Sequence, residues 1–285
     1  PEIMLHLRRL GLLDLEAKTV AGQPLGDILQ WWETSTRREQ LRELLLRRDG
    51  VNPDDVIIAP AEAKRRGLTS TVCFPTGNLC PEGSVIKSTA IDPDVVDDDG
   101  VYRITGPARV FTTERGAIAA IKGQTTQPVV AGDIVVLICR GPLGAGMEEI
   151  YQITAALRYL EFGKQVAVIT DARFSGVSTG ACIGHVGPEA LAGGPIGKLI
   201  DGDTLSISVD TIELEGRIDL VGEADERFDA DEGERRLAAR SPRSDLAADP
   251  ELPPETRLWA LLQQLSGGTW GGCVYDADAL ADALK

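Results

Sequence analysis

The run DIVVLICRGPLGAGMEEIYQITAALRYLEFGKQVAVITDARFS (residues 133–175) has the pattern of a strand, a glycine-rich turn, a helix and a second strand. Ile134–Cys139 and Val166–Thr170 are continuous apolar runs, which are typical of strands buried on both faces. Between them, residues 147–160 carry apolar side chains at helical spacing. A crossover this short predicts two parallel strands, and ligands of such sheets bind beyond the carboxyl ends of the strands.

The turns that follow these two strands contain polar side chains suited to chemistry. The first turn leads into Glu148 and Glu149, and the second contains Ser175. We therefore expect a carboxylate and a hydroxyl to face one pocket at this edge of the sheet. Both have structural alternatives, because carboxylates stabilise the first turn of a helix and a serine often caps one. The residues alone leave these alternatives open.

Outward from this unit, the pattern changes to short strands between Gly, Pro and Asp turns, with helical patterns toward both ends. Further strands are expected at Val56–Ile58, Thr71–Phe74, Ser84–Ser88, Val101–Ile104, Ala108–Phe111, Thr204–Val209 and Thr211–Leu214. A helix is expected at Thr113–Ile121, capped by Thr112 or Thr113. Residues 222–256 are charged and rich in proline, which predicts an exposed arm. Many short strands with few helices favour a strongly curved or closed α/β sheet that helices cover.

The composition limits the partners and the compartment. The 285 residues carry a formal net charge of −15, which argues against nucleic acid or an anionic membrane as a partner. No apolar run approaches the ~20 residues of a membrane span. Five widely spaced cysteines favour reduced thiols in a cytoplasmic protein. The chain begins at Pro1 within a helical pattern, so we expect it to be a piece of a longer protein.

Several common catalytic motifs are incomplete. The turn Gly141–Gly146 lacks the Lys-Ser/Thr of a phosphate-binding loop, which leaves phosphoryl transfer as a weak alternative. Ser175 is not in Gly-x-Ser-x-Gly, and the sequence indicates no histidine partner for it. His6 lies in an amphipathic helical pattern, which favours a structural role. A serine hydroxyl without such help is a poor base and would need a cation or cluster beside it. No Cys-x-x-Cys is present, so we expect no zinc or iron–sulfur site within this chain.

Several segments of the sequence resemble the dihydroxy-acid and sugar-acid dehydratase family. They are TDARFSGVS (170–178), CIGHVGPEA (182–190), GNL (77–79), PEG (81–83) with Lys87, RGP (140–142), GMEE (146–149), GGP (193–195) and DGD (201–203). The resemblance covers about residues 1–220. The tail SGGTWGGCVYD (266–276) is similar to the branch of the family that includes bacterial D-xylonate dehydratases.

The resemblance implies a domain organisation. Family members are about twice as long, and an amino-terminal α/β domain outside this sequence carries their three cluster cysteines and most of their magnesium ligands. Residues 56–221 then correspond to the family's β-barrel-like swivelling domain with flanking helices. Residues 1–55 correspond to a helical segment that is either the tail of the amino-terminal domain or a linker from it. Residues 222–285 form the exposed arm and a carboxyl-terminal helical extension.

The resemblance also implies roles for individual residues. Glu149 matches the glutamate that this domain contributes to magnesium, and Ser175 matches the base that removes the C2 proton. Arg173, Ser178 and Thr179 are expected to bind substrate. His185 is left open between a structural and a catalytic role. Cys80 and Val177 depart from the residues that many members carry, and neither departure affects Glu149 or Ser175.

The function implied is that of the carboxyl-terminal part of a hydro-lyase. It would dehydrate a 2,3-dihydroxy sugar acid such as D-xylonate to a 2-keto-3-deoxy acid, with Mg²⁺ and a 2Fe–2S or 4Fe–4S iron–sulfur cluster as cofactors. The implied partners are the sugar acid, the protein's own amino-terminal domain and further copies in a cytoplasmic homo-oligomer. We expect this chain alone to be inactive. The alternatives are a non-catalytic binding or regulatory domain without the iron–sulfur half, and a dehydratase for branched-chain dihydroxy acids.

Overall fold

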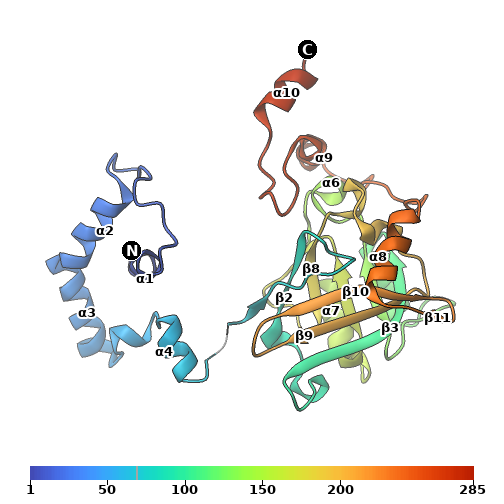
Figure 1. Cartoon of the computed structure of the whole chain (residues 1–285), viewed down its shortest axis with the longest axis horizontal. Coiled ribbons are helices and arrows are strands. Elements are labelled where there is room, and N and C mark those ends of the chain that lie inside the picture. Colours follow the sequence, from blue (N-terminus) through green and yellow to red (C-terminus); the bar gives the residue numbers. More distant parts are fainter. Residues whose placement is uncertain (69) are drawn as a thin grey trace. The chain divides into compact units, whose positions relative to one another are not determined.

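The computed structural model describes residues 1–68 and 70–285. The chain divides between residues 69 and 70 into two compact units, which we describe separately (Figure 1). Within the described residues, no helix combines the length and the apolar character that crossing a membrane requires.

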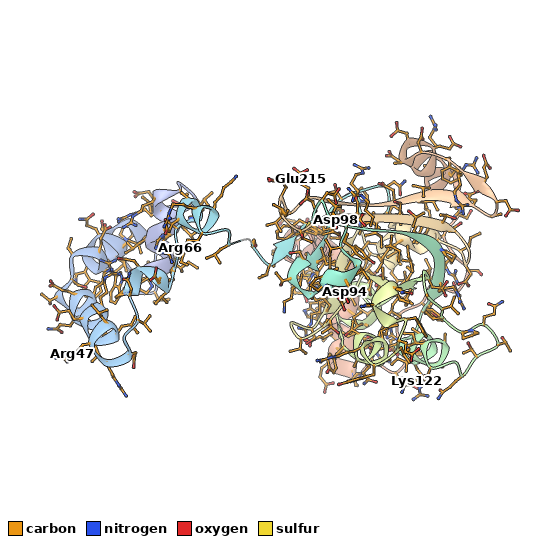
Figure 2. All side chains as sticks on the ribbon, turned by 90° about the horizontal axis from the view of Figure 1, so that it is seen from below. Arg47, Arg66, Asp94, Asp98, Lys122 and Glu215 are labelled. Carbon is orange, nitrogen blue, oxygen red and sulfur yellow. The ribbon has the colours of Figure 1, made fainter. Side chains whose placement is uncertain are left out.

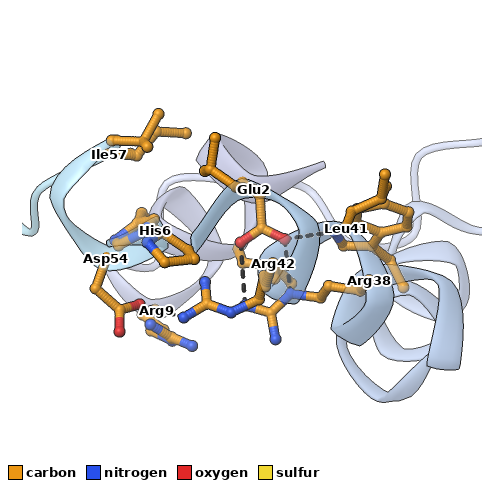
Figure 3. Close-up of a pocket in the computed structure, with 13 residues that line it drawn as sticks. Glu2, His6, Arg9, Arg38, Leu41, Arg42, Asp54 and Ile57 are labelled. Atoms are coloured by element: carbon orange, nitrogen blue, oxygen red, sulfur yellow. Dashed lines mark hydrogen bonds and ion pairs between the residues drawn. The ribbon is translucent and has the colours of Figure 1, made fainter. Parts of the chain in front are cut away.

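The first unit is helical. It contains α1 (Glu2–Arg9), α2 (Leu25–Thr34), α3 (Thr36–Asp49), the 3-10 helix η1 (Pro53–Asp55) and α4 (Pro60–Arg65). Glu2 joins three of these helices, because its carboxylate accepts from the Arg38 guanidinium at 2.6 and 3.0 Å and from the Trp32 indole at 2.8 Å. Figure 3 shows this ion pair at a pocket that Leu41 and Ile57 also line. The strand expected at Val56–Ile58 is not formed. The described residues of this unit contain no strand with which it could pair.

In the second unit, nine of the described strands form one curled sheet (Figure 1). Its order is β1 (Val72–Cys73), β2 (Gly83–Lys87), β8 (Cys182–Gly187), β6 (Ala167–Thr170), β4 (Ile134–Leu137), β3 (Val101–Phe111), β9 (Thr204–Asp210), β10 (Gly216–Glu223) and β11 (Glu226–Arg227). The four central strands β8, β6, β4 and β3 are parallel, which confirms the predicted β4–β6 crossover. The remaining pairs are antiparallel.

The parallel strands are buried on both faces, as their apolar runs predict. Ile134 and Val136 belong to one core cluster, whereas Val135 and Leu137 belong to another on the opposite face. The second cluster is closed by α5 (Glu114–Ile121) and α7 (Gln152–Arg158). α5 begins after Thr113, whose side chain accepts from the Gly116 amide at 3.1 Å, so the predicted cap is confirmed.

The remaining helices connect or cover the strands. They are α6 (Pro142–Ala145), α8 (Ala230–Ala239), α9 (Pro254–Leu262), α10 (Ala277–Ala283), and the 3-10 helices η2 (Ser88–Ala90), η3 (Pro93–Val95), η4 (Gly163–Gln165), η5 (Ala190–Ala192), η6 (Pro195–Lys198) and η7 (Gln263–Leu265).

The strand β3 replaces two expected strands. Residues 101–107 pair with β9, and residues 108–111 pair with β4, so one strand passes from the antiparallel part of the sheet to the parallel part. Gly106 stands at the change of partner, where a Cβ atom would lie 1.9 Å from the Gly132 carbonyl oxygen. The close approach of the backbone therefore requires glycine here.

Other expectations need correction. The helix expected over residues 147–160 is shorter, because Glu149–Ile150 form the strand β5, which pairs in parallel with β7 (Arg173–Phe174). Residues 211–213 are a turn, residue 214 is not in a strand, and the strand that follows β9 is β10. Part of residues 222–256 is not an exposed arm, since α8 places Leu237 in the core.

Candidate active site

One fully buried carboxylate organises the edge where β4 and β6 end. Asp171 follows β6 directly and is 0 % exposed. It accepts from the backbone amides of Cys139 at 3.1 Å, Arg140 at 2.9 Å and Ala190 at 3.1 Å. Burial raises the pKa of the Asp171 carboxyl, although these three amides oppose the shift. Asp171 thus ties the end of β4 and the start of η5 to the end of β6.

A second buried carboxylate holds the glycine-rich turn. Glu189 accepts from the Leu143 amide of α6 at 2.9 Å. A Cβ atom at Gly141 would lie 2.5 Å from a Glu189 carboxylate oxygen, so glycine leaves the space that this side chain fills. Burial raises the pKa of the Glu189 carboxyl to about 7, and the Asp171 charge acts in the same direction.

The raised pKa of Glu189 predicts a pH effect on stability. Between its ordinary value of 4.5 and about 7 the folded state binds more protons at Glu189 than the unfolded state does, so stability falls as pH rises. Relative to Glu189→Gln, which can still accept from Leu143, wild-type unfolding free energy should drop by about 1 kcal/mol per pH unit in this window. Urea unfolding from pH 4.5 to 8 measures this difference. Glu161→Gln, at an exposed glutamate, is the control, and a wild-type curve parallel to that of Glu189→Gln would contradict the prediction.

The expected magnesium ligand lies in the two-stranded sheet. Glu149 of β5 stands opposite Arg173 of β7, and a Glu149 carboxylate oxygen lies 3.0 Å from an Arg173 guanidinium nitrogen. The Glu149 side chain is 39 % exposed. Arg173 also donates to the Met147 carbonyl at 3.2 Å. The structure therefore brings two of the predicted site residues together and leaves the carboxylate open to solvent.

Glu148 has a different environment. It lies 3.2 Å from the Arg140 guanidinium, which also pairs with Asp249. Burial raises the pKa of the Glu148 carboxyl, and the Arg140 charge opposes the shift. Neither glutamate belongs to the first turn of a helix, so that alternative is wrong for both.

Ser175 follows β7 immediately and is 9 % exposed. Residues 176–177 form a turn and residues 178–179 are not helical, so Ser175 is not a helix cap. Among residues 1–68 and 70–285, the one hydrogen bond that its hydroxyl accepts is a long contact of 3.4 Å from the Val177 amide. Its carbonyl accepts from the Ser178 amide at 2.9 Å. The Ser178 hydroxyl is buried and has no hydrogen-bond partner among the described residues, which leaves it available to a ligand. Thr179, the next residue, is half-buried.

His185 supports this turn from β8. Its amide donates to the Ala172 carbonyl at 2.8 Å, and its ring meets the Phe174 ring edge-on with centroids 6.1 Å apart. Burial lowers the pKa of the His185 imidazole, and the Arg173 charge adds to the effect. A neutral ring packed on Phe174 fits a structural role.

The described residues do not form a metal site by themselves. No group of three or more His, Cys, Asp or Glu side chains in residues 1–68 and 70–285 is placed to hold a metal ion. Glu149 is a single accessible carboxylate and fits one position in a site completed by other oxygen ligands. Burial raises the pKa of the thiols of Cys73 and Cys139 to about 11 and of Cys80 and Cys182 to about 12.

Three residues that shape the site were not assigned a role from the sequence. Asp171 and Glu189 lie in quoted motifs, but nothing in a single sequence distinguishes a buried carboxylate in a turn from an exposed one. The role of Arg140 could have been predicted, because an arginine directly after a fully apolar strand is partly buried and needs carboxylate partners nearby.

Comparisons with known proteins show the family of this chain. Residues 57–251 match the family described as dihydroxy-acid/6-phosphogluconate dehydratase C-terminal. D-xylonate dehydratase YagF of Escherichia coli (strain K12) is 58 % identical over 285 residues, which is 100 % of this chain and 43 % of that protein. D-xylonate dehydratase YjhG of the same strain is 55 % identical over 287 residues, with the same coverage. A dihydroxy-acid dehydratase of Agathobacter rectalis is 39 % identical over 214 residues, 75 % of this chain and 33 % of that protein.

The chain therefore spans less than half the length of these relatives. The match covers most of this chain, including Asp171, Ser175 and Glu149. The chain belongs to the dihydroxy-acid/6-phosphogluconate dehydratase family and contains its carboxyl-terminal domain.

Proposed function

We propose that this chain is the carboxyl-terminal part of a hydro-lyase that dehydrates a 2,3-dihydroxy sugar acid such as D-xylonate to a 2-keto-3-deoxy acid. The observation that carries the proposal is the 58 % identity, along the whole chain, to a D-xylonate dehydratase. In this proposal residues 56–221 act as the swivelling domain, and residues 1–55 connect it to an amino-terminal domain. The remaining residues, 222–285, extend it at the carboxyl end. The complete enzyme would be a cytoplasmic homo-oligomer.

The base in this proposal is Ser175. A cation beside Ser175 would favour the alkoxide form of its hydroxyl. The alkoxide takes the proton from C2 of the substrate, and the electron pair left behind forms a C2–C3 double bond as hydroxide leaves C3. The enol that results tautomerises to the 2-keto acid. The position of Ser175 supports this role, because among the described residues its hydroxyl has only one long hydrogen-bond contact, and it sits where a parallel strand ends.

The residues around Ser175 would orient the substrate. The free Ser178 hydroxyl and Thr179 provide hydrogen bonds to the substrate's hydroxyls, and Arg173 holds Glu149 in place while offering positive charge to the substrate carboxylate. Glu149 would provide one ligand to Mg²⁺. When bound, Mg²⁺ and an iron–sulfur cluster would supply Lewis acidity to the substrate carboxylate and to the departing C3 hydroxyl.

Turnover by a full-length enzyme that contains this chain tests the proposal. We expect the purified, iron-loaded enzyme to be brown and to convert D-xylonate faster than a branched-chain 2,3-dihydroxy acid. We expect the 285-residue chain alone to convert neither, because its described residues hold no complete metal site. The assay measures 2-keto acid formation together with iron and magnesium content.

Each other outcome overturns a part of this proposal. Turnover of D-xylonate by the purified chain alone would refute the proposal that the active site also needs residues of the amino-terminal domain. Preference for the branched-chain acid would reassign the substrate. A colourless, iron-free and inactive full-length protein would favour a non-catalytic binding or regulatory domain.

A further inference from the structure

A loop near the carboxyl terminus carries a tryptophan onto the sheet. Residues 266–276, which we call the Trp270 loop, are closed by a bridge between Ser266 and Tyr275 and by a 3.1 Å hydrogen bond from the Gly267 amide to the Val274 carbonyl. The Gly271 amide donates a hydrogen bond to the Gly267 carbonyl at 3.1 Å. This closed loop is placed in the second unit and holds the Trp270 side chain, which is 38 % exposed.

The indole of Trp270 lies in a cradle made by two glycines. Gly83 of β2 and Gly187 of β8 stand directly opposite each other in the sheet. A Cβ atom at Gly83 would lie 2.7 Å from the indole ring, and one at Gly187 would lie 2.3 Å from it. Any other residue at either position would therefore displace the ring. The edge of the Phe74 ring adds a further aromatic contact, with centroids 6.3 Å apart.

A hydrogen bond connects this cradle to the candidate active site. The indole N–H of Trp270 donates to the His185 carbonyl at 2.9 Å. His185 has a positive φ of 56°, a conformation that costs a residue other than glycine free energy and persists only when its surroundings hold it. The indole is one such restraint, and the bond from the His185 amide to the Ala172 carbonyl is another.

His185 in turn restrains the residues around Ser175. Its ring packs edge-on against Phe174, which also rests on Gly184, where a Cβ atom would lie 2.7 Å from the Phe174 ring. Phe174 is the residue before Ser175, and with Arg173 it forms the strand that pairs with Glu149–Ile150. Continuous contacts therefore lead from Trp270 through His185 and Phe174 to both proposed functional positions.

We propose that Trp270 is a positioning residue that fixes the conformation of His185 and thereby the placement of Ser175 and Glu149. The catalytic part of this inference rests on the proposed function, whereas the placement of residues 172–178 does not. The indole N–H is the essential group, because the ring alone fills the cradle without restraining the His185 carbonyl.

Trp270→Phe tests the role of the N–H, since phenylalanine keeps an aromatic ring in the cradle but cannot donate. A neutral hydrogen bond contributes about 1 kcal/mol, so amide exchange at His185 and Ser178 of the 285-residue chain should speed up by about fivefold. In the full-length enzyme kcat should fall by about five- to tenfold with KM changed less than about twofold. Gly187→Ala, which expels the ring, should have effects at least as large. Trp31→Phe is the control, because Trp31 is exposed in the first unit.

The outcomes separate this inference from the proposed function. Unchanged amide exchange in Trp270→Phe would overturn the positioning role whatever the activity. A lower melting temperature with unchanged kcat would also overturn it, because it would show that Trp270 only stabilises the fold. Faster exchange at His185 and Ser178 in Trp270→Phe, found beside a wild-type enzyme that turns over no sugar acid, would support the positioning role and refute the proposed function.

Discussion

Ser175→Ala is expected to lower kcat for D-xylonate by about 10²–10⁴ in a full-length enzyme that contains this chain, which is the usual contribution of a positioned proton acceptor. The change removes one hydroxyl and leaves the Glu149–Arg173 pair intact. Little stability should be lost, because within the part of the chain that the structure describes the hydroxyl accepts only the 3.4 Å contact from Val177 and caps no helix. Initial rates, iron content and melting temperature should be measured on one sample.

Ser244→Ala provides the matched control, since Ser244 is exposed in the segment after α8. It should leave both kcat and the melting temperature unchanged. A Ser175→Ala enzyme with normal kcat would show that another group takes the C2 proton. A large loss of folded protein would instead show that the hydroxyl is structural, which its single long contact does not predict.

Asp171→Ala is expected to destabilise the second unit by about 3–5 kcal/mol, because it leaves three buried backbone amides without an acceptor. Each orphaned amide costs about 1–3 kcal/mol, and neighbouring losses are not additive. Urea unfolding followed by circular dichroism measures the change. Asp171→Asn keeps one acceptor oxygen and should recover part of the lost stability.

Asp98→Ala is the control for this experiment. Asp98 lies in an exposed turn, and Figure 2 shows it at the surface of the second unit. Its replacement should change the unfolding free energy by less than about 0.5 kcal/mol. Equal stability of Asp171→Ala and Asp98→Ala would contradict the anchoring role of Asp171.

The parallel centre of the sheet could be predicted because its signal is local and strong. Ile134–Cys139 and Val166–Thr170 are apolar at every position, and only a strand covered on both faces explains so short a run. The cap at Thr113 could be predicted for the same reason, since a capping side chain acts on an amide three residues away. The edge of the sheet at which the candidate site is proposed follows from these elements.

The features that were missed depend on contacts between distant residues. The strand β8 contains two glycines in six residues, which hides its apolar pattern. The pairing of β5 with β7 spans only two residues in each strand, which is too short to produce a recognisable alternation in the sequence. Glu149 therefore lies in a strand and not in the expected helix. Trp270 and Gly187 are far apart along the chain, and only the fold brings them together.

The order of strands in the sheet has a consequence for synthesis on the ribosome. The strand β2 lies between β1 and β8, and β8 begins about a hundred residues later, at Cys182. Until β8 has been made, β2 keeps an open hydrogen-bonding edge that a neighbouring nascent chain could pair with. The Gly83–Gly187 cradle stays empty still longer, until Trp270 has left the exit tunnel. This half of the sheet is thus completed late, so a polypeptide that stopped before residue 270 would expose the bare glycine backbone of β2 and β8.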